Sequence, residues 1–203
     1  MKSFSNFDKA KENAKYKGSA QLPVGGYEAK IKEVRYEEGK DGKSDMITIA
    51  FDITSGEYKD FFKKKFDEDT SEDKKWKGKA TIYCPKDDGS EQDEWTKNAF
   101  ARWTNALEDS NKDYTWDWDE KKWKGLKIGL IYGRTGAVIN GKPVEFTEVR
   151  FPESIDNIKS GNYKTPNFKE RKGYAEAVNA TVAKPNADGF MNIPDNVDED
   201  LPF

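Results

Sequence analysis

Alternating apolar and polar positions predict three strands in the first third of the chain. In Tyr27–Tyr36 the apolar positions alternate with one slip, which a β-bulge explains. Met46–Ile53 is apolar or β-branched at nearly every position, which favours a central strand. After a turn at Ser55-Gly56, Tyr58–Phe66 is expected to return antiparallel. These segments together predict a three-stranded meander.

A helix and two further strands are predicted in the second half. Ser90–Asp109 carries apolar residues at helical spacing and begins with a serine that suits a helix cap. Leu126–Tyr132 and Val144–Phe151 have the pattern of strands, and Asn140-Gly141 between them is typical of a hairpin turn. The short apolar run Thr81–Cys84 is either an additional strand or the lead-in to the helix.

The predicted order is three strands, one principal helix and two strands. This is the order of an OB-fold, a small, partly open, five-stranded Greek-key barrel. We therefore expect a mainly β protein with an OB-fold domain over residues 22–168 and an N-terminal extension over residues 1–21. Residues 169–203 lose apolar periodicity, so we expect a disordered tail with an acidic tip.

Composition and charge exclude several classes of function. The 203 residues include no His and a single Cys, Cys84, which removes Ser-His-Asp and Cys-His catalysis, His or thiolate metal sites and internal disulfides. No Asp/Glu set has a recognisable catalytic spacing, so we expect no enzyme activity and no cofactor. The lone thiol fits a reducing cytoplasm, and neither a membrane span nor a secretory signal is recognisable.

The formal net charge of −3 is unevenly distributed along the chain. From Lys184 onwards there are five acidic residues and one lysine, so the rest of the chain is close to neutral. Acidic ends on nearly neutral bodies are usually interaction tails. The negative total therefore does not argue against nucleic acid binding by the body.

Lysines and aromatic rings are interleaved in three segments. Ammonium groups can follow a phosphate chain while rings stack on unpaired bases, so this mixture is typical of single-stranded nucleic acid binding. The alternative for Tyr58–Phe66 is an amphipathic strand with Phe61 or Phe62 in the core. For the two Lys-Lys-Trp-Lys segments, the alternative is a Trp that anchors a loop. The candidate DNA-binding residues are Lys59, Phe62, Lys63, Lys64, Lys65, Lys74, Lys75, Trp76, Lys77, Lys121, Lys122, Trp123 and Lys124.

Two other groups of residues have different expected roles. Tyr114, Trp116 and Trp118 alternate among acidic residues that would repel phosphate, so we expect them mainly to pack structurally. The last residues combine acids with an apolar end, which could dock a ring in an apolar pocket while a basic rim holds the acids. The candidate protein-interaction residues are Asp198, Glu199, Asp200, Leu201, Pro202 and Phe203.

Two parts of the chain resemble known single-stranded DNA-binding proteins. Val197-Asp-Glu-Asp-Leu-Pro-Phe203 is similar to the acidic tip of the bacterial and phage proteins, with Leu201 in place of the commoner Ile. The body resembles a group from phages and prophages of Gram-positive bacteria. The matching motifs are Leu22-Pro-Val-Gly-Gly-Tyr27, Phe51-Asp-Ile-Thr-Ser-Gly-Glu-Tyr58, Leu107-Glu-Asp-Ser-Asn111 and Trp116-Asp-Trp-Asp119.

This resemblance implies an OB-fold that coats single-stranded DNA during phage replication or recombination in the cytoplasm of the bacterial host. It also implies a tip that recruits replication and repair proteins, and a homodimer is compatible with it. Two alternatives stay open. One is a phage protein–protein adaptor whose barrel does not touch DNA, and the other is a glycan-binding β-barrel that uses exposed Trp.

Overall fold

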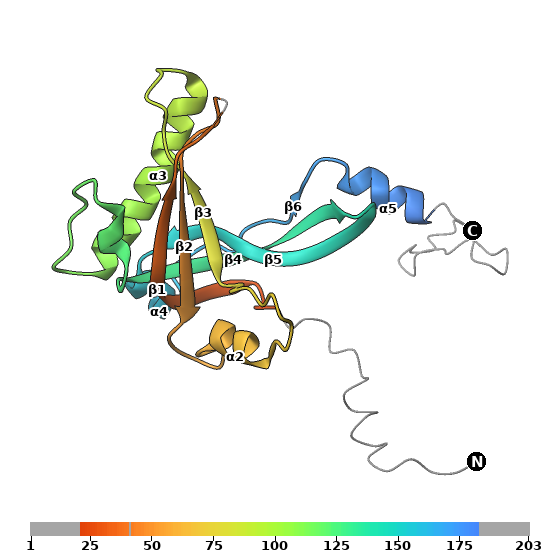
Figure 1. The fold of residues 1–203 in the computed structure, drawn as a ribbon, viewed down its shortest axis with the longest axis horizontal. Coiled ribbons are helices and arrows are strands. Elements are labelled where there is room, and N and C mark those ends of the chain that lie inside the picture. Colours follow the sequence, from red (N-terminus) through yellow and green to blue (C-terminus); the bar gives the residue numbers. More distant parts are fainter. Residues whose placement is uncertain (1–20, 41, 183–203) are drawn as a thin grey trace, which may run out of the picture.

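The computed structural model describes residues 21–40 and 42–182, which form one open, mainly antiparallel sheet with helices around it (Figure 1). The strand order is β3-β2-β1-β4-β5, and β6 pairs in parallel with β4. The strands are β1 (Gly25–Glu37), β2 (Met46–Ile53), β3 (Lys79–Tyr83), β4 (Lys127–Ile139), β5 (Lys142–Glu153) and β6 (Lys169–Glu170). The helices are α2 (Phe61–Glu68), α3 (Glu91–Ser110), the 3₁₀-helix η1 (Glu120–Trp123), α4 (Ile155–Ser160) and α5 (Tyr174–Val182).

The two predicted N-terminal strands are confirmed. β1 pairs with β2 through Ala29–Glu37 and with β4 through Gly25–Lys30, so one long strand links two parts of the sheet. Its register shifts between Ile31 and Glu33, at the slip in the hydrophobic pattern. β2 lies between β1 and β3, which agrees with the central position predicted for Met46–Ile53.

The core lies against the inner face of these strands. Alternate residues of β2 point inward, because successive strand side chains point to opposite faces. α3 contributes Leu107 to the same core, and β4 contributes Ile128 and Leu130. The fully buried residues of β2 are Ile49, Phe51 and Ile53, with Ile47 almost completely buried.

The strand predicted for Tyr58–Phe66 is wrong, because α2 begins within it. Asp52 is buried on β2 and accepts hydrogen bonds from the first backbone N–H groups of α2. The distances are 3.0 Å from the nitrogen of Phe62 and 3.1 Å from that of Lys63. This carboxylate satisfies donors that a helix otherwise leaves unpaired at its N-terminus. The third strand is instead β3, in the apolar run whose role the sequence left open.

The helix predicted at Ser90–Asp109 is confirmed as α3. The Ser90 hydroxyl accepts a hydrogen bond from the backbone nitrogen of Asp93 at 3.1 Å, which is the expected cap. α3 lies between β3 and β4 in the chain and packs its buried side chains Trp103, Ala106 and Leu107 toward the sheet. Trp95, at its N-terminal end, is 70 % exposed.

The predicted hairpin is also confirmed, but it is longer than expected. Asn140 and Gly141 both have positive φ, at 52° and 74°, as a tight two-residue hairpin turn requires. β4 and β5 extend to this turn and form an arm that projects from the rest of the sheet (Figure 1).

The expectation of disorder from Lys169 is wrong for residues 169–182. β6 pairs with β4 there, and α5 places the buried Tyr174 against Gly136 of β4. The remaining residues of the predicted tail, 183–203, lie outside the described part of the chain, as do residues 1–20 of the predicted N-terminal extension.

Candidate nucleic-acid interface

The strands β1, β2 and β3 present a second face that points away from the core, here called the outer face. Its three cross-strand rows are Arg35, Thr48 and Thr81; Glu33, Ala50 and Lys79; and Glu37, Met46 and Tyr83. The middle of each row is a half-buried β2 side chain, and two of these are small. Tyr83 is 60 % exposed, and Arg35 and Lys79 are also exposed. The outer face thus offers a shallow surface with cations and a ring at its margins.

Trp76 is held at one end of β2 by two hydrogen bonds. Its indole N–H donates to the carbonyl oxygens of Phe51 at 3.0 Å and Gly78 at 3.1 Å. A Cβ at Gly78 would lie 2.6 Å from the ring of Phe62, so this close approach needs a glycine. The strand end and α2 therefore fix the orientation of the indole ring, which remains half-buried.

Cations and rings alternate around this indole. The ammonium nitrogen of Lys32 lies 5.3 Å from the Trp76 ring centroid, and the Phe66 ring centroid lies 5.8 Å from it. The ammonium nitrogen of Lys74 lies 4.6 Å from the Phe66 ring. These four side chains come from β1, α2 and the loop between α2 and β3, and we call them the Trp76 cluster.

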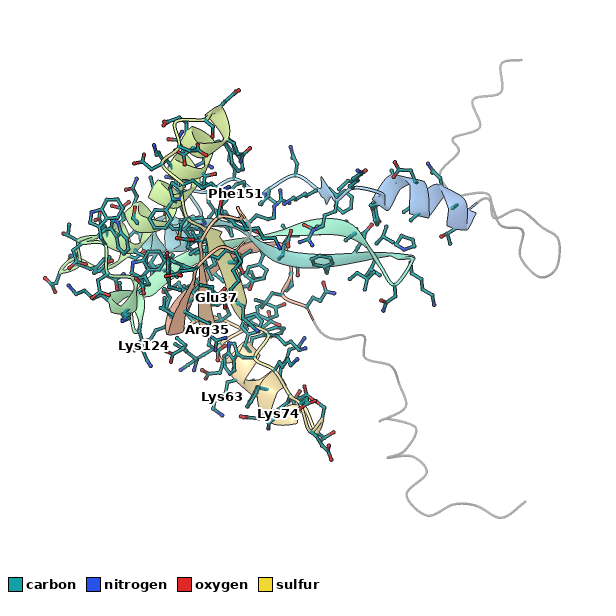
Figure 2. All side chains as sticks on the ribbon, turned by 45° about the horizontal axis from the view of Figure 1, so that its top comes forward. Arg35, Glu37, Lys63, Lys74, Lys124 and Phe151 are labelled. Atoms are coloured by element: carbon teal, nitrogen blue, oxygen red, sulfur yellow. The ribbon has the colours of Figure 1, made fainter. Side chains whose placement is uncertain are left out.

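The predicted lysines of α2 and the following loop gather beside this cluster. In Figure 2, Lys63 and Lys74 project from α2 and from the loop after it. Partial burial beside Phe61 lowers the pKa of Lys65, whereas the neighbouring lysines are exposed. The candidate DNA-binding lysines that are exposed in this region are Lys59, Lys63, Lys64, Lys74, Lys75 and Lys77.

Two of the predicted stacking rings are buried, which contradicts their assignment. Trp123 is 0 % exposed, and its indole N–H donates to the Tyr114 hydroxyl at 2.8 Å. Phe62 is 7 % exposed and packs edge-on against Phe51. A ring inside the core has no free face for a base. Trp76 is the predicted stacking ring that the structure leaves half-buried.

The lysines around Trp123 remain outside the core but divide into two groups. The ammonium nitrogen of Lys124 lies 2.7 Å from a carboxylate oxygen of Glu33 on the outer face. Lys124 also lines a groove of about 420 Å³ together with Lys30 and Lys32. This groove links the η1 region to the Trp76 cluster, because Lys32 belongs to both. Lys122 instead pairs with Asp117, and Lys121 follows the acidic cap residue Asp119.

Sequence reasoning missed five side chains at this surface: Lys30, Lys32, Phe66, Lys79 and Tyr83. The polar positions of β1 already marked Lys30 and Lys32 as outward-facing. Lys79 and Tyr83 could have been found only by taking Lys79–Tyr83 as the third strand. Arg35 also lies in the outer face, whereas Arg134 pairs with Glu145 on the hairpin arm.

The rings of the acidic segment differ in their surroundings. Tyr114 and Trp116 pack around Trp123, in agreement with the structural role predicted for them. Trp118, however, is 84 % exposed. The predicted protein-interaction residues Asp198, Glu199, Asp200, Leu201, Pro202 and Phe203 lie outside the described residues.

Neither metal chemistry nor a membrane-crossing helix is visible in the described part of the chain. Residues 21–40 and 42–182 bring no three His, Cys, Asp or Glu side chains together as a metal site. In the same residues no helix combines the length and apolarity needed to cross a bilayer. No protein family model and no curated protein sequence matches the chain.

Proposed function

We propose that the chain binds single-stranded DNA without catalysing a reaction on it. The observation that carries this proposal is the Trp76 cluster, in which two rings alternate with two cations beside the outer face. A base can stack on a ring, and the lysines of α2 and its loop can bind the adjacent phosphates. The groove beside β1 extends this surface toward Lys124, with three lysines and the carboxylates of Asp52 and Asp60 in its lining.

The topology supports the finer proposal of an open OB-fold. The order β3-β2-β1-β4-β5, with α3 between β3 and β4 in the chain, is the order of that barrel before its two outer strands join. A groove of about 620 Å³, here called the edge groove, has Lys79 of β3 on one side and Phe146 of β5 on the other. The ligand face of an OB-fold includes strands β2 and β3, which here carry the outer face.

The biological setting and the role of the tip are part of the same proposal. We infer a role in phage DNA replication or recombination, in which the acidic tip Asp198–Phe203 recruits replication or repair proteins. Support comes from the sequence resemblance and from the combination of acids with an apolar end.

Fluorescence anisotropy of a labelled oligo-dT with the full-length protein tests DNA binding. We expect binding that weakens steeply with salt, because phosphate contacts release counterions. A duplex competitor should displace little protein, because paired bases present no free ring faces. If oligo-dT does not bind at low salt, even after removal of the tip, the adaptor function replaces this proposal. Salt-independent binding of oligo-dT would contradict the phosphate-binding role proposed for the lysines.

A further inference from the structure

Another cavity lies at the other end of β2 from Trp76. It has a volume of about 520 Å³ and is enclosed by α3, by the neighbouring ends of β1 and β3, and by the loop before η1. We call it the aromatic pocket. Its apolar walls include Tyr36, Cys84, Pro85, Phe100, Trp116 and Trp118.

Trp118 is the most unusual residue of this pocket. Its indole is 84 % exposed although it lies beside Trp116, with ring centroids 5.8 Å apart. Its backbone φ is 67°, in the left-handed region that is uncommon for a bulky residue. Core packing does not account for a large ring held outward in this conformation. Such outliers cluster at ligand-binding sites.

The polar lining of the aromatic pocket is acidic. Asp87 and Glu120 both line it. The lining also includes Lys97, but its ammonium nitrogen lies 2.8 Å from Asp87, 3.0 Å from Asp93 and 3.2 Å from Glu94. Three carboxylates therefore surround one cation, and their hydrogen bonds raise the pKa of Lys97 above its usual value. The pocket thus suits a ligand that combines apolar rings with positive charge.

The first 20 residues of the chain have this composition. They hold five lysines against two acidic residues, together with the rings of Phe4, Phe7 and Tyr16. The acidic tip has the opposite charge and would be repelled by Asp87 and Glu120. Charge complementarity therefore favours the N-terminal segment over the C-terminal one.

The N-terminal segment is also long enough to reach the pocket. Its attachment point is Gln21, whose side-chain oxygen accepts a hydrogen bond from the Thr147 nitrogen at 2.9 Å. From there β1 leads from Gly25 to Tyr36 at the pocket, a rise of at most about 36 Å. Extended chain from Gln21 spans roughly 56 Å to Phe4 and roughly 46 Å to Phe7, so both rings can reach the pocket.

We propose that the segment Met1–Ala20 docks in the aromatic pocket, with Phe4 and Phe7 among its rings and lysines beside Asp87 and Glu120. Docking covers Cys84 and the exposed ring of Trp118. The inference does not rest on DNA binding, because no residue of the Trp76 cluster lines this pocket.

Disulfide trapping tests this docking in the full-length protein. Cys84 is the only cysteine, so Ser5→Cys introduces one partner between the two proposed anchor rings. In a buffer of oxidised and reduced glutathione at about pH 8.5, the new thiolate at position 5 attacks oxidised glutathione, which gives a mixed disulfide and releases one reduced glutathione. The Cys84 thiolate then attacks the sulfur at position 5 and releases the second glutathione. Burial raises the pKa of the Cys84 thiol to about 11, so this second step is slow unless docking holds the two sulfurs together. We expect the disulfide between residues 5 and 84 to predominate in peptide maps. A monomer-sized product and a dimer-sized product both support docking, since each copy carries the same segment.

Matched controls keep the same tether but remove the proposed contacts. In the Ser5→Cys protein, adding Phe4→Ala with Phe7→Ala, or Trp118→Ala, should lower the disulfide yield at least fivefold. Asp87→Asn with Glu120→Gln should lower it as well, and so should added salt. Equal yields in all these proteins would overturn the proposal.

The alkylation rate of Cys84 in the natural sequence gives a second readout. Substituting Phe4 and Phe7 by Ala should accelerate alkylation severalfold, because docking covers the thiol. Acceleration on deleting Asp195–Phe203 instead would identify the acidic tip as the occupant and overturn the proposal.

Discussion

Trp76 and Trp123 occupy the same local sequence, Lys-Lys-Trp-Lys-Gly, but have different environments. Trp123 precedes β4 in the interior of the sheet and donates its N–H to Tyr114. Trp76 precedes β3, an outer strand, and donates to backbone carbonyls at the end of β2. The sequence left stacking and anchoring open for both residues. The difference comes from tertiary partners, which the local sequence does not contain.

A stability comparison tests the structural assignment of Trp123. We expect Trp123→Ala to lower the free energy of unfolding by about 3–5 kcal/mol, because it empties a fully buried site. Trp76→Ala should lower the free energy of unfolding by a smaller amount, because the Trp76 ring is only half-buried. Urea denaturation followed by circular dichroism measures both. A larger loss for Trp76→Ala would contradict the burial of these rings.

A binding comparison tests the role proposed for Trp76 in DNA binding. Trp76→Ala should weaken oligo-dT binding by about 1–3 kcal/mol, or roughly 5- to 150-fold, because one stacking platform is lost. Trp95→Ala is the matched control, since Trp95 is exposed on α3 and lies outside the Trp76 cluster. Anisotropy at one salt concentration measures the two affinities. If both substitutions change the affinity for oligo-dT equally, Trp76 is not part of the interface.

The elements with local signals were the ones predicted correctly. The cap of α3 at Ser90 and the hairpin turn at Asn140-Gly141 are both encoded within a few residues. α2 is different, because its capping carboxylate comes from Asp52 on β2. α5 likewise depends on a distant partner, since Tyr174 packs against β4. The structure therefore places the candidate lysines of this segment on a helix, where the sequence analysis expected a strand.

The cap of α2 can be removed with a single substitution. Asp52→Ala leaves the backbone N–H groups of Phe62 and Lys63 without their acceptor, so we expect a loss of about 1–3 kcal/mol in the free energy of unfolding. Asp60→Gly is the control. Asp60 precedes α2, makes no side-chain cap bond among the described residues and has φ of 60°, which glycine tolerates. Chemical denaturation of both variants measures their free energies of unfolding, and the loss should be larger for Asp52→Ala than for Asp60→Gly. If Asp52→Ala is neutral, another contact holds α2.

The docking of α5 on the hairpin arm should depend on pH. Hydrogen bonds from Tyr174 and then from Arg134 lower the pKa of Glu145. A carboxylate with a lowered folded-state pKa adds stability above its unfolded pKa, and this stability is lost as pH falls through the folded value. We therefore expect the amide-exchange protection factors of α5 to decrease below about pH 4.5.

Glu145→Gln provides the control for this acid sensitivity. The variant should show weaker protection at neutral pH and a flatter pH response, because its amide does not titrate. An unchanged acid response in Glu145→Gln would assign the effect to another carboxylate.

At the scale of the whole molecule, the described residues form two hollows that differ in charge, and both combine charged with apolar side chains. The edge groove combines Lys65, Lys77 and Lys79 with the apolar side chains of Val144 and Phe146. The aromatic pocket combines rings with carboxylates. The two ends of the chain have the complementary compositions, basic with rings at residues 1–20 and acidic with an apolar end at residues 195–203. The sequence alone identified the ends, whereas the two hollows required the tertiary structure.

This arrangement predicts competition between the acidic tip and DNA for the basic surface. Deleting Asp195–Phe203 removes four acidic residues and changes the formal net charge from −3 to +1. We expect the deletion to strengthen oligo-dT binding, most strongly at low salt, where exposed charges are least screened. It should also abolish recruitment of replication or repair proteins, measured by co-purification from phage-infected cells.

A second variant separates charge from docking in this competition. Leu201→Ala with Phe203→Ala keeps every acid but removes the apolar end. If the tip competes by seating Phe203 in an apolar site, this variant should strengthen DNA binding nearly as much as the deletion. If it competes only through its charge, the variant should bind like the natural sequence. Unchanged affinity after the full deletion would rule out competition, because both forms of it require the acids to leave the basic surface before DNA can bind.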